Sequence, residues 1–445
     1  MTQITVWLAQ IQLYTSLGFL LVFLALEFGL AWALCCFRFR ALAGRDAAGW
    51  LAAYRYWARV YALIAVPSMV AWLPVLVQTG SLWPGLPARA SEVLSPLTAV
   101  ALLSLFIFKS CFQGAMLFGQ RRLSESAHAM VVFMVALGVT VWSFWLLAMF
   151  SWMQAPTGAH MVDGAYLVYD WRRVVLNPAL PGNAALFGSA SVLATAFLLM
   201  GLTAAQTLRR QADDAGRLVC RAASWTALVS AGLLLVSADL AGRATAQLQP
   251  AKAAAAAGYQ ISGAPADLIL LARHPGQADT VRSGLVRGGA DRWLGRDAEG
   301  LRGLDEFSGM EPPVAVVFWT FRLAALFGLL LSLASVLSLW RLWRVGYDPG
   351  RLSRSGRWSL SLLSFAGWPL LLAGLAYGYF GNYPYAVQGG VTLSEVVGET
   401  SPDGLYWLYA GQLLLYVALL IGLGQLLRHG VRHGVVPVAR HRGRA

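Results

Sequence analysis

The sequence predicts an all-α integral membrane protein. Of its 445 residues, 58% are hydrophobic and only 12% are charged, whereas a soluble domain has about 45–50% apolar and about 25% charged residues. Apolar runs long enough to cross about 30 Å of hydrocarbon recur nine times along the chain. These observations exclude an ordinary soluble enzyme, a disordered chain and a fibrous repeat. The first residues, Met-Thr-Gln-Ile, lack the basic stretch of a cleaved signal peptide, so we expect the first span to be retained.

The nine predicted spans follow one another in order. The second is the least regular, because Arg55 and Arg59 fall in its first turns. We place the spans at 12–37, 55–78, 95–118, 129–153, 186–208, 220–243, 314–340, 358–380 and 404–427. The chain then divides into transmembrane helices 1–6 (residues 1–243), a long loop (244–313), helices 7–9 (314–427) and a basic tail (428–445).

The distribution of charge predicts the orientation. The segments after spans 1, 3, 5, 7 and 9 carry a net charge of +16, whereas the opposite side carries −4. Because loops rich in Lys and Arg stay in the cytoplasm, we expect the N-terminus and the loop 244–313 outside and the C-terminus in the cytoplasm. The basic side then faces anionic membrane lipid. Nucleic acid is not predicted as a partner, because no basic patch is interleaved with aromatic residues.

Three ionisable residues lie inside the predicted spans, where charge is costly and usually functional. At a rise of about 1.5 Å per residue, Glu27 in span 1 and Lys109 in span 3 reach a similar depth. We therefore hypothesise a Glu27–Lys109 ion pair. The alternatives are that each meets water or another subunit, or that Glu27 relays protons. Arg322 lies about two turns into span 7.

The cysteines and histidines predict no metal site. Cys35, Cys36, Cys111 and Cys220 form no CxxC or CxxCH spacing, so neither a disulfide framework nor attached c-type haem is indicated. His429 and His433 are four residues apart, but they lie on a basic segment that Gly430 interrupts. We interpret this segment as a solvated tail.

The segment from Trp152 to Pro156, which reads Trp-Met-Gln-Ala-Pro and includes Gln154, resembles subunit I of the cytochrome bd quinol oxidases. Matches continue in order along most of the chain, among them Gln12, Gly29, Gly138, Asn177-Pro178, Arg322, Trp368 and Pro384. Nine helices, an outer N-terminus and a long outer loop between helices 6 and 7 are also the layout of that family. The resemblance implies a respiratory complex in a bacterial or archaeal cytoplasmic membrane.

The resemblance also implies where haem ligands should stand, and this chain differs at each of those positions. The family's ligand histidines, its ligand methionine and the acidic residues of helices 3 and 8 align with Leu20, Leu186, Ala324, Ala101, Lys109 and Leu372. Haem iron is held by His, Met, Cys or Tyr side chains, and Leu and Ala offer no lone pair. We therefore expect no haem on this chain, and haem b and d on a partner subunit.

The outer loop keeps only part of the family's quinol-binding pattern. Lys252 fits a family lysine near the quinol, but the glutamate expected five residues later reads Ala257. The resemblance makes Lys252 a candidate quinol contact, and the alternative is a solvated loop lysine. In the family the arginine matched by Arg322 lies near haem propionates. Here we expect Arg322 to hold an acid of the outer loop or a lipid phosphate.

Three functions remain open from the sequence. The first is a haem-free structural subunit that forms a heterodimer with an intact, haem-binding subunit I-like chain in a quinol oxidase complex. The second is a stand-alone quinone- or lipid-binding membrane protein, or a transporter that reuses the fold. The third is an active quinol oxidase with re-sited haem ligands. The resemblance leaves quinone as a candidate ligand in each of them.

Overall fold

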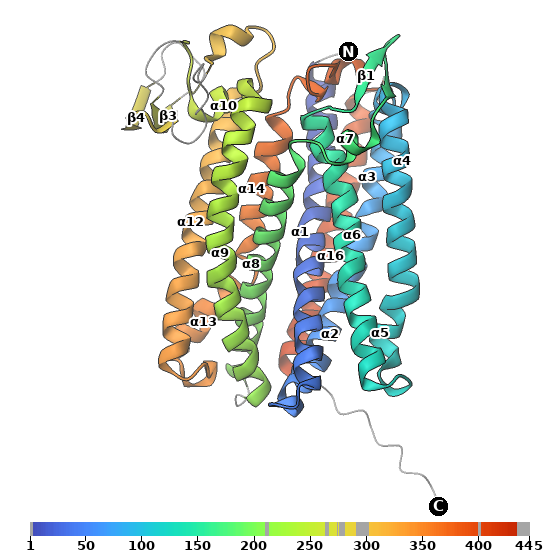
Figure 1. The fold of residues 1–445 in the computed structure, drawn as a ribbon. Helices are drawn as coiled ribbons and strands as arrows, with labels where there is room; N and C mark the ends of the chain where they lie inside the picture. The colour runs from blue at the N-terminus through green and yellow to red at the C-terminus, as the bar shows by residue number, and fades with distance from the viewer. Residues whose placement is uncertain are drawn as a thin grey trace, which may run out of the picture.

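The predicted helical membrane fold is confirmed by the structure, a computed structural model. It describes residues 3–209, 213–262, 267–273, 275, 281–290, 302–398 and 402–433. Within these residues, nine segments are long and apolar enough to cross a membrane. They stand side by side as an upright bundle (Figure 1).

The membrane segments are built from the following helices. Six of them come before the long loop: α1 (Gln3–Leu42), α2 (Ala47–Val70) with α3 (Trp72–Ser81), α4 (Gly85–Ile107) with a π-helix (Phe108–Gln113) and α5 (Gly114–Phe118), α6 (Glu125–Gln154), α8 (Leu180–Thr207) and α9 (Asp214–Leu248). Three come after it: α12 (Val314–Arg344), α13 (Arg354–Leu362) with α14 (Gly367–Phe380), and α16 (Pro402–His433).

Shorter elements connect these helices. Three antiparallel hairpins lie at one end of the bundle, which we call the sheet end (Figure 1): β1 (Ala159–Val162) with β2 (Ala165–Val168), β3 (Leu268–Arg273) with β4 (Val281–Val286), and β5 (Tyr385–Val387) with β6 (Val391–Thr392). The short helices α7 (Trp171–Val175), α10 (Pro250–Ala257) and α15 (Leu393–Val396) lie in the same connections. The other end, which we call the short-loop end, holds the turns at 43–46, 122–124 and 345–353.

Several helices extend beyond the predicted spans. α2 begins at Ala47 rather than at residue 55, and Arg55 and Arg59 lie on its exposed face. α9 ends at Leu248, inside the predicted loop. α16 continues to His433, so the first residues of the predicted basic tail are helical. Arg432 in the last turn of α16 interacts favourably with the helix dipole. The remainder of that tail lies outside the described residues.

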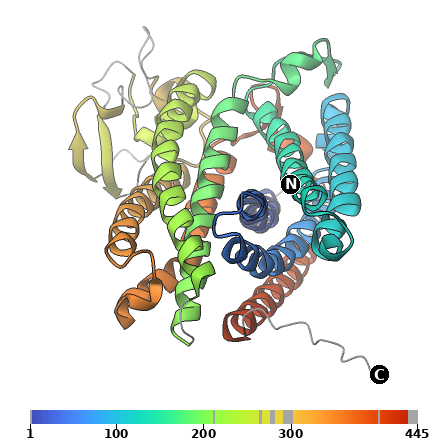
Figure 2. The same ribbon diagram turned by 60° about the horizontal axis from the view of Figure 1, so that its bottom comes forward.

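α1 forms the centre of the fold. It packs against α2, α6, α8, α14 and α16, and Figure 2 shows it enclosed by other helices. The close approach to α8 needs a glycine, since a Cβ added at Gly29 would lie 2.1 Å from Thr195 Oγ1. The largest hydrophobic cluster of the described residues surrounds this helix. The apolar runs of the sequence therefore become a core as well as a lipid-facing surface.

Candidate functional site

The structure brings Glu27 and Lys109 together in the interior of the bundle. Glu27 lies on α1 and Lys109 on the π-helix, and the Lys109 Nζ is 2.7 Å from Glu27 Oε1 and 3.0 Å from Oε2. The Glu27 side chain is fully buried, and that of Lys109 is 10% exposed. The two charges that the sequence placed at a similar depth are thus direct partners.

Further groups satisfy both charges. The Tyr61 hydroxyl donates to Glu27 Oε1 at 3.1 Å, and Lys109 Nζ donates to the Ala65 carbonyl at 3.3 Å. The ammonium also lies 5.2 Å from the centroid of the Trp142 ring, within the range of a cation–π interaction. A buried ion pair offsets its desolvation only when additional hydrogen bonds complete it. Both additional hydrogen bonds of this pair involve α2, through Tyr61 and Ala65, and α6 adds the Trp142 ring.

Lys109 lies on the π-helix Phe108–Gln113. Single π-helical turns inside α-helices often mark functional positions. Here the π-helical turn packs directly on α6 at Gly138. A Cβ added at Gly138 would lie only 2.3 Å from Phe108 Cβ. Neither the π-helix nor the roles of Tyr61 and Trp142 could be predicted from the sequence. Gly138 was visible in the sequence, but only as a residue that matched the family.

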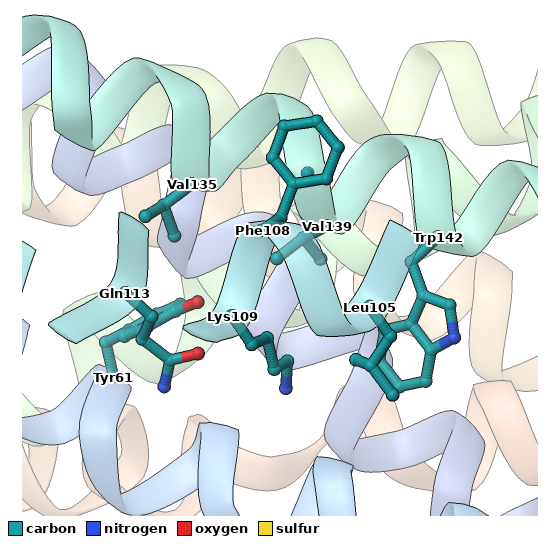
Figure 3. Close-up of a pocket in the computed structure, with 9 residues that line it drawn as sticks. Tyr61, Leu105, Phe108, Lys109, Gln113, Val135, Val139 and Trp142 are labelled. Atoms are coloured by element: carbon teal, nitrogen blue, oxygen red, sulfur yellow. The ribbon is translucent and has the colours of Figure 1, made fainter. Parts of the chain in front are cut away.

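A small cavity adjoins the pair. It measures about 10 Å³, and Tyr61, Lys109, Gln113 and Trp142 are among its lining residues. Figure 3 shows Lys109 and Gln113 extending to the same side of the π-helix. Gln113 Oε1 is buried without a hydrogen-bond partner. A cavity of this size is marginal for a single water molecule, so the surroundings of the pair are closely packed.

The positions that the resemblance assigns to haem ligands and their partner acids are occupied by packed side chains. Leu20 and Ala101 are buried in the largest hydrophobic cluster, and Leu186 and Leu372 pack against it. Ala324 is half-buried on α12. None of these hydrocarbon side chains can ligate iron, and at the sixth position Lys109 already binds Glu27. The residues present therefore do not fit axial ligation of haem at these positions.

Other potential metal ligands are dispersed. His128 is buried on α6, with Nε2 3.1 Å from the Met116 carbonyl oxygen, and the described cysteines are all free. Within the described residues, no three His, Cys, Asp or Glu side chains form a group that could hold a metal ion.

Lys252 is buried, so the alternative of a solvated lysine is wrong. Its side chain on α10 is covered by α14: Nζ lies 4.6 Å from the Tyr377 ring centroid, and a Cβ at Gly381 would lie 2.7 Å from Lys252 Cδ. Nζ donates to Gln249 Oε1 at 3.0 Å. Burial lowers the pKa of Lys252 to about 7. Ala257, at the position of the missing glutamate, is also buried.

Arg322 binds carbonyl groups, which corrects the expectation of an acid or a lipid phosphate. Its guanidinium donates to the carbonyls of Ala256 at 2.7 Å, Phe318 at 2.8 Å and Leu270 at 2.9 Å, and also to that of Ile269. Ala256 lies in the last turn of α10, where the helix dipole favours a cation. Arg322 thus fastens α10 and β3 to α12 within the described part of the chain.

Trp152, Gln154 and Trp368, which match family residues, make packing contacts and hydrogen bonds within the bundle. Trp152 is buried and donates to the Thr157 carbonyl at 3.1 Å. Gln154 Oε1 accepts a hydrogen bond from Asn183 Nδ2 at 3.0 Å, which joins α6 to α8. Trp368 packs edge-on against Phe23 and Phe365. These contacts indicate structural roles.

Known proteins resemble this chain over almost its whole length. Residues 8–435 match the family described as cytochrome bd terminal oxidase subunit I. The cytochrome bd ubiquinol oxidase subunit 1 of Bacillus subtilis (strain 168) is 24% identical over 421 residues, covering 89% of this chain and 87% of the relative. The cytochrome bd-II ubiquinol oxidase subunit 1 of Escherichia coli (strain K12) is 25% identical, covering 83% and 84%. The bd oxidase structure from Geobacillus thermodenitrificans superposes with a TM-score of 0.85 at 20% identity, covering 97% of this chain and 99% of that one.

Proposed function

Because the chain belongs to the cytochrome bd terminal oxidase subunit I family, we propose that it is a haem-free structural subunit of a bd-type quinol:oxygen oxidoreductase complex. It would form a heterodimer with an intact, haem-binding subunit I-like chain. In this role the chain contributes helices and an interface, and the redox chemistry belongs to the partner. We place the complex in the cytoplasmic membrane of a bacterium or archaeon, with the sheet end outside.

The observation that carries the proposal is the replacement of a family acid by Lys109. The ammonium is neutralised inside the chain by Glu27, with Tyr61, Ala65 and Trp142 completing its surroundings. A buried site that satisfies its own charges needs no cofactor to balance them. The packing of Leu20, Leu186 and Leu372 in or against the same hydrophobic cluster supports the proposal further.

The geometry of Lys252 does not favour quinol oxidation on this chain. Its amine is bound to Gln249 and covered by Tyr377 and Gly381. A quinol would have to displace these groups before reaching the amine. We keep quinone as a candidate ligand of this chain, but we assign electron transfer to the partner subunit.

The experiment that tests the proposal compares the purified chain alone with the chain co-expressed with a subunit I-like chain of the same membrane. Haem is quantified per mole of protein by its visible absorption after conversion to the pyridine complex. We expect no haem bands from the chain alone, together with co-purification of the haem-containing partner. Stoichiometric haem on the chain alone overturns the haem-free assignment. Failure to co-purify with the partner overturns the assignment to a heterodimer.

A further inference from the structure

A surface hollow lies at the sheet end, between the last turn of α6 and the first turn of α8. Its volume is about 410 Å³, and its lining residues include Pro156, Thr157, Tyr169, Arg173, Leu176 and Pro178. These residues belong to the connection that runs through the β1–β2 hairpin and α7. Figures 1 and 2 show this connection at one end and on the perimeter of the bundle. None of them takes part in the ion pair or in the contacts of Lys252.

The walls of the hollow are held in place by hydrogen bonds. The Thr157 hydroxyl donates to the Arg173 carbonyl at 2.9 Å, and the Gly158 carbonyl accepts from the backbone N–H groups of Tyr169 and Asp170, each at 3.0 Å. Asn177, between the lining residues Leu176 and Pro178, donates through Nδ2 to the Ala148 carbonyl at 3.3 Å, which ties this part of the connection to α6. Pro156 and Pro178 restrict the backbone further. The hollow is therefore preformed.

The hollow lies where membrane spans end. The α6 span ends at Gln154, and the α8 helix begins at Leu180. Between them, Tyr169, Trp171 and Leu176 are exposed by 59%, 45% and 58%. Exposed aromatic residues beside apolar ones are typical of the boundary between hydrocarbon and lipid headgroups. This places the hollow at headgroup depth.

Arg173 supplies the charge of the hollow. Its side chain is 68% exposed, and its partner among the described residues is Asp170, whose Oδ2 lies 3.4 Å from Arg173 Nε. That separation exceeds the usual length of a charge-assisted hydrogen bond. Asp170 also caps α7, because its Oδ1 accepts from the N–H groups of Arg172 and Arg173. Asp170 is thus engaged by the backbone, and within the described residues the Arg173 side chain is paired only through its Nε.

We propose that this hollow binds the phosphodiester group of a membrane phospholipid. Arg173 donates to the phosphate oxygens, since a guanidinium matches phosphate geometry, and the Tyr169 hydroxyl is a second donor on the rim. Leu176 and the two prolines contact the glycerol and the first methylene groups of the acyl chains. An apolar wall of this extent favours a lipid over free phosphate, which has no hydrocarbon to bury.

Native mass spectrometry of the full chain in detergent tests the proposal, with phosphatidylglycerol titrated as the probe. Arg173→Gln removes the cation from an exposed position, so the fold should be retained, and the melting temperature checks this. Arg172→Gln is the matched control, because Arg172 is also exposed but does not line the hollow. We expect Arg173→Gln to weaken retention of the tightest-bound lipid about tenfold, and Arg172→Gln to leave it unchanged.

Two results would overturn the proposal. Equal retention in both variants would assign the bound lipid to the general surface of the bundle. Displacement of the lipid by inorganic phosphate at millimolar concentration would identify a free-anion site instead. Leu176→Ala is a second probe, and it should weaken lipid retention while leaving any binding of inorganic phosphate unaffected, because it removes apolar contact without adding charge.

Discussion

Lys109 lies in the apolar interior, where Glu27 is its counter-ion. Removal of one partner leaves the other charge buried without compensation, which destabilises a protein by about 3–5 kcal/mol. We therefore expect Glu27→Gln to lower stability strongly, because Lys109 Nζ would keep only a weakened contact to residue 27 beside the Ala65 carbonyl and the Trp142 ring. Thermal unfolding in detergent measures the effect.

The double variant Glu27→Gln, Lys109→Met is the control for this prediction. With no cation left to desolvate, it should recover most of the lost stability, because apolar replacements of buried pairs are often neutral or stabilising. If the single and the double variants melt at the same temperature, the pair contributes nothing beyond its separate side chains. That result would contradict the interpretation of Glu27 as the counter-ion of Lys109.

Because Lys252 is buried, we expect the free energy of unfolding to depend on pH. Burial lowers its pKa from 10.5 to about 7 in the folded chain. Between these values the folded state holds a neutral amine while the unfolded state holds a proton, so stability rises with pH across this window. Below pH 7 both states are protonated, and the dependence disappears. Relative to Lys252→Met, the wild type should gain up to about 1.4 kcal/mol per pH unit.

Melting temperatures at pH 6, 7.5 and 9 measure this effect. The wild type should be less stable than Lys252→Met at pH 6, and the difference should shrink towards pH 9. A difference that stays constant with pH would show that Lys252 is protonated in the folded chain throughout this range. Lys252→Arg is the control, because its guanidinium stays charged at every pH tested.

At the scale of the elements, the close contact between α6 and the π-helix depends on Gly138, which has no side chain. Gly138→Ala would place a Cβ 2.3 Å from Phe108 Cβ, so one of the two elements must move. We expect this variant to be destabilised by about 1–3 kcal/mol, as overpacked cores are. Lys109, next to Phe108, should lose alignment with Glu27. Thermal unfolding of the variant checks the prediction.

Gly232→Ala is the matched control, because α9 has nothing within 4 Å of that Cβ position. There the added methyl should be neutral or stabilising by about 0.5–1 kcal/mol, since glycine weakens a helix interior. Equal effects of the two alanines would mean that α6 and the π-helix are not in close contact.

The course of the spans could be predicted from the sequence, because apolar length alone determines which segments cross a membrane. The depths of Glu27 and Lys109 followed from the constant rise of a helix. Their partners Tyr61 and Trp142 could not be predicted, since the rotation of each helix depends on its neighbours. The burial of Lys252 was missed for a related reason: it depends on α14, which is distant in sequence.

For the whole molecule, the charge asymmetry predicts the orientation. In the sequence, the segments after spans 1, 3, 5, 7 and 9 carry a net charge of +16, and segments rich in Lys and Arg remain in the cytoplasm. In a background without native cysteines, Glu311→Cys at the sheet end should react with a membrane-impermeant maleimide in intact cells. Arg351→Cys, exposed at the short-loop end, should react only after permeabilisation. The reverse labelling pattern would overturn the orientation.

The ion pair and the packed leucines also bear on how the protein is made. A chain whose interior is completed by its own side chains can reach its final packing as soon as its helices meet in the bilayer. We expect its accumulation in cells to be independent of tetrapyrrole supply. In the proposed heterodimer, the supply of tetrapyrrole would then limit only the haem-binding subunit, and the amount of that subunit would set the number of complexes.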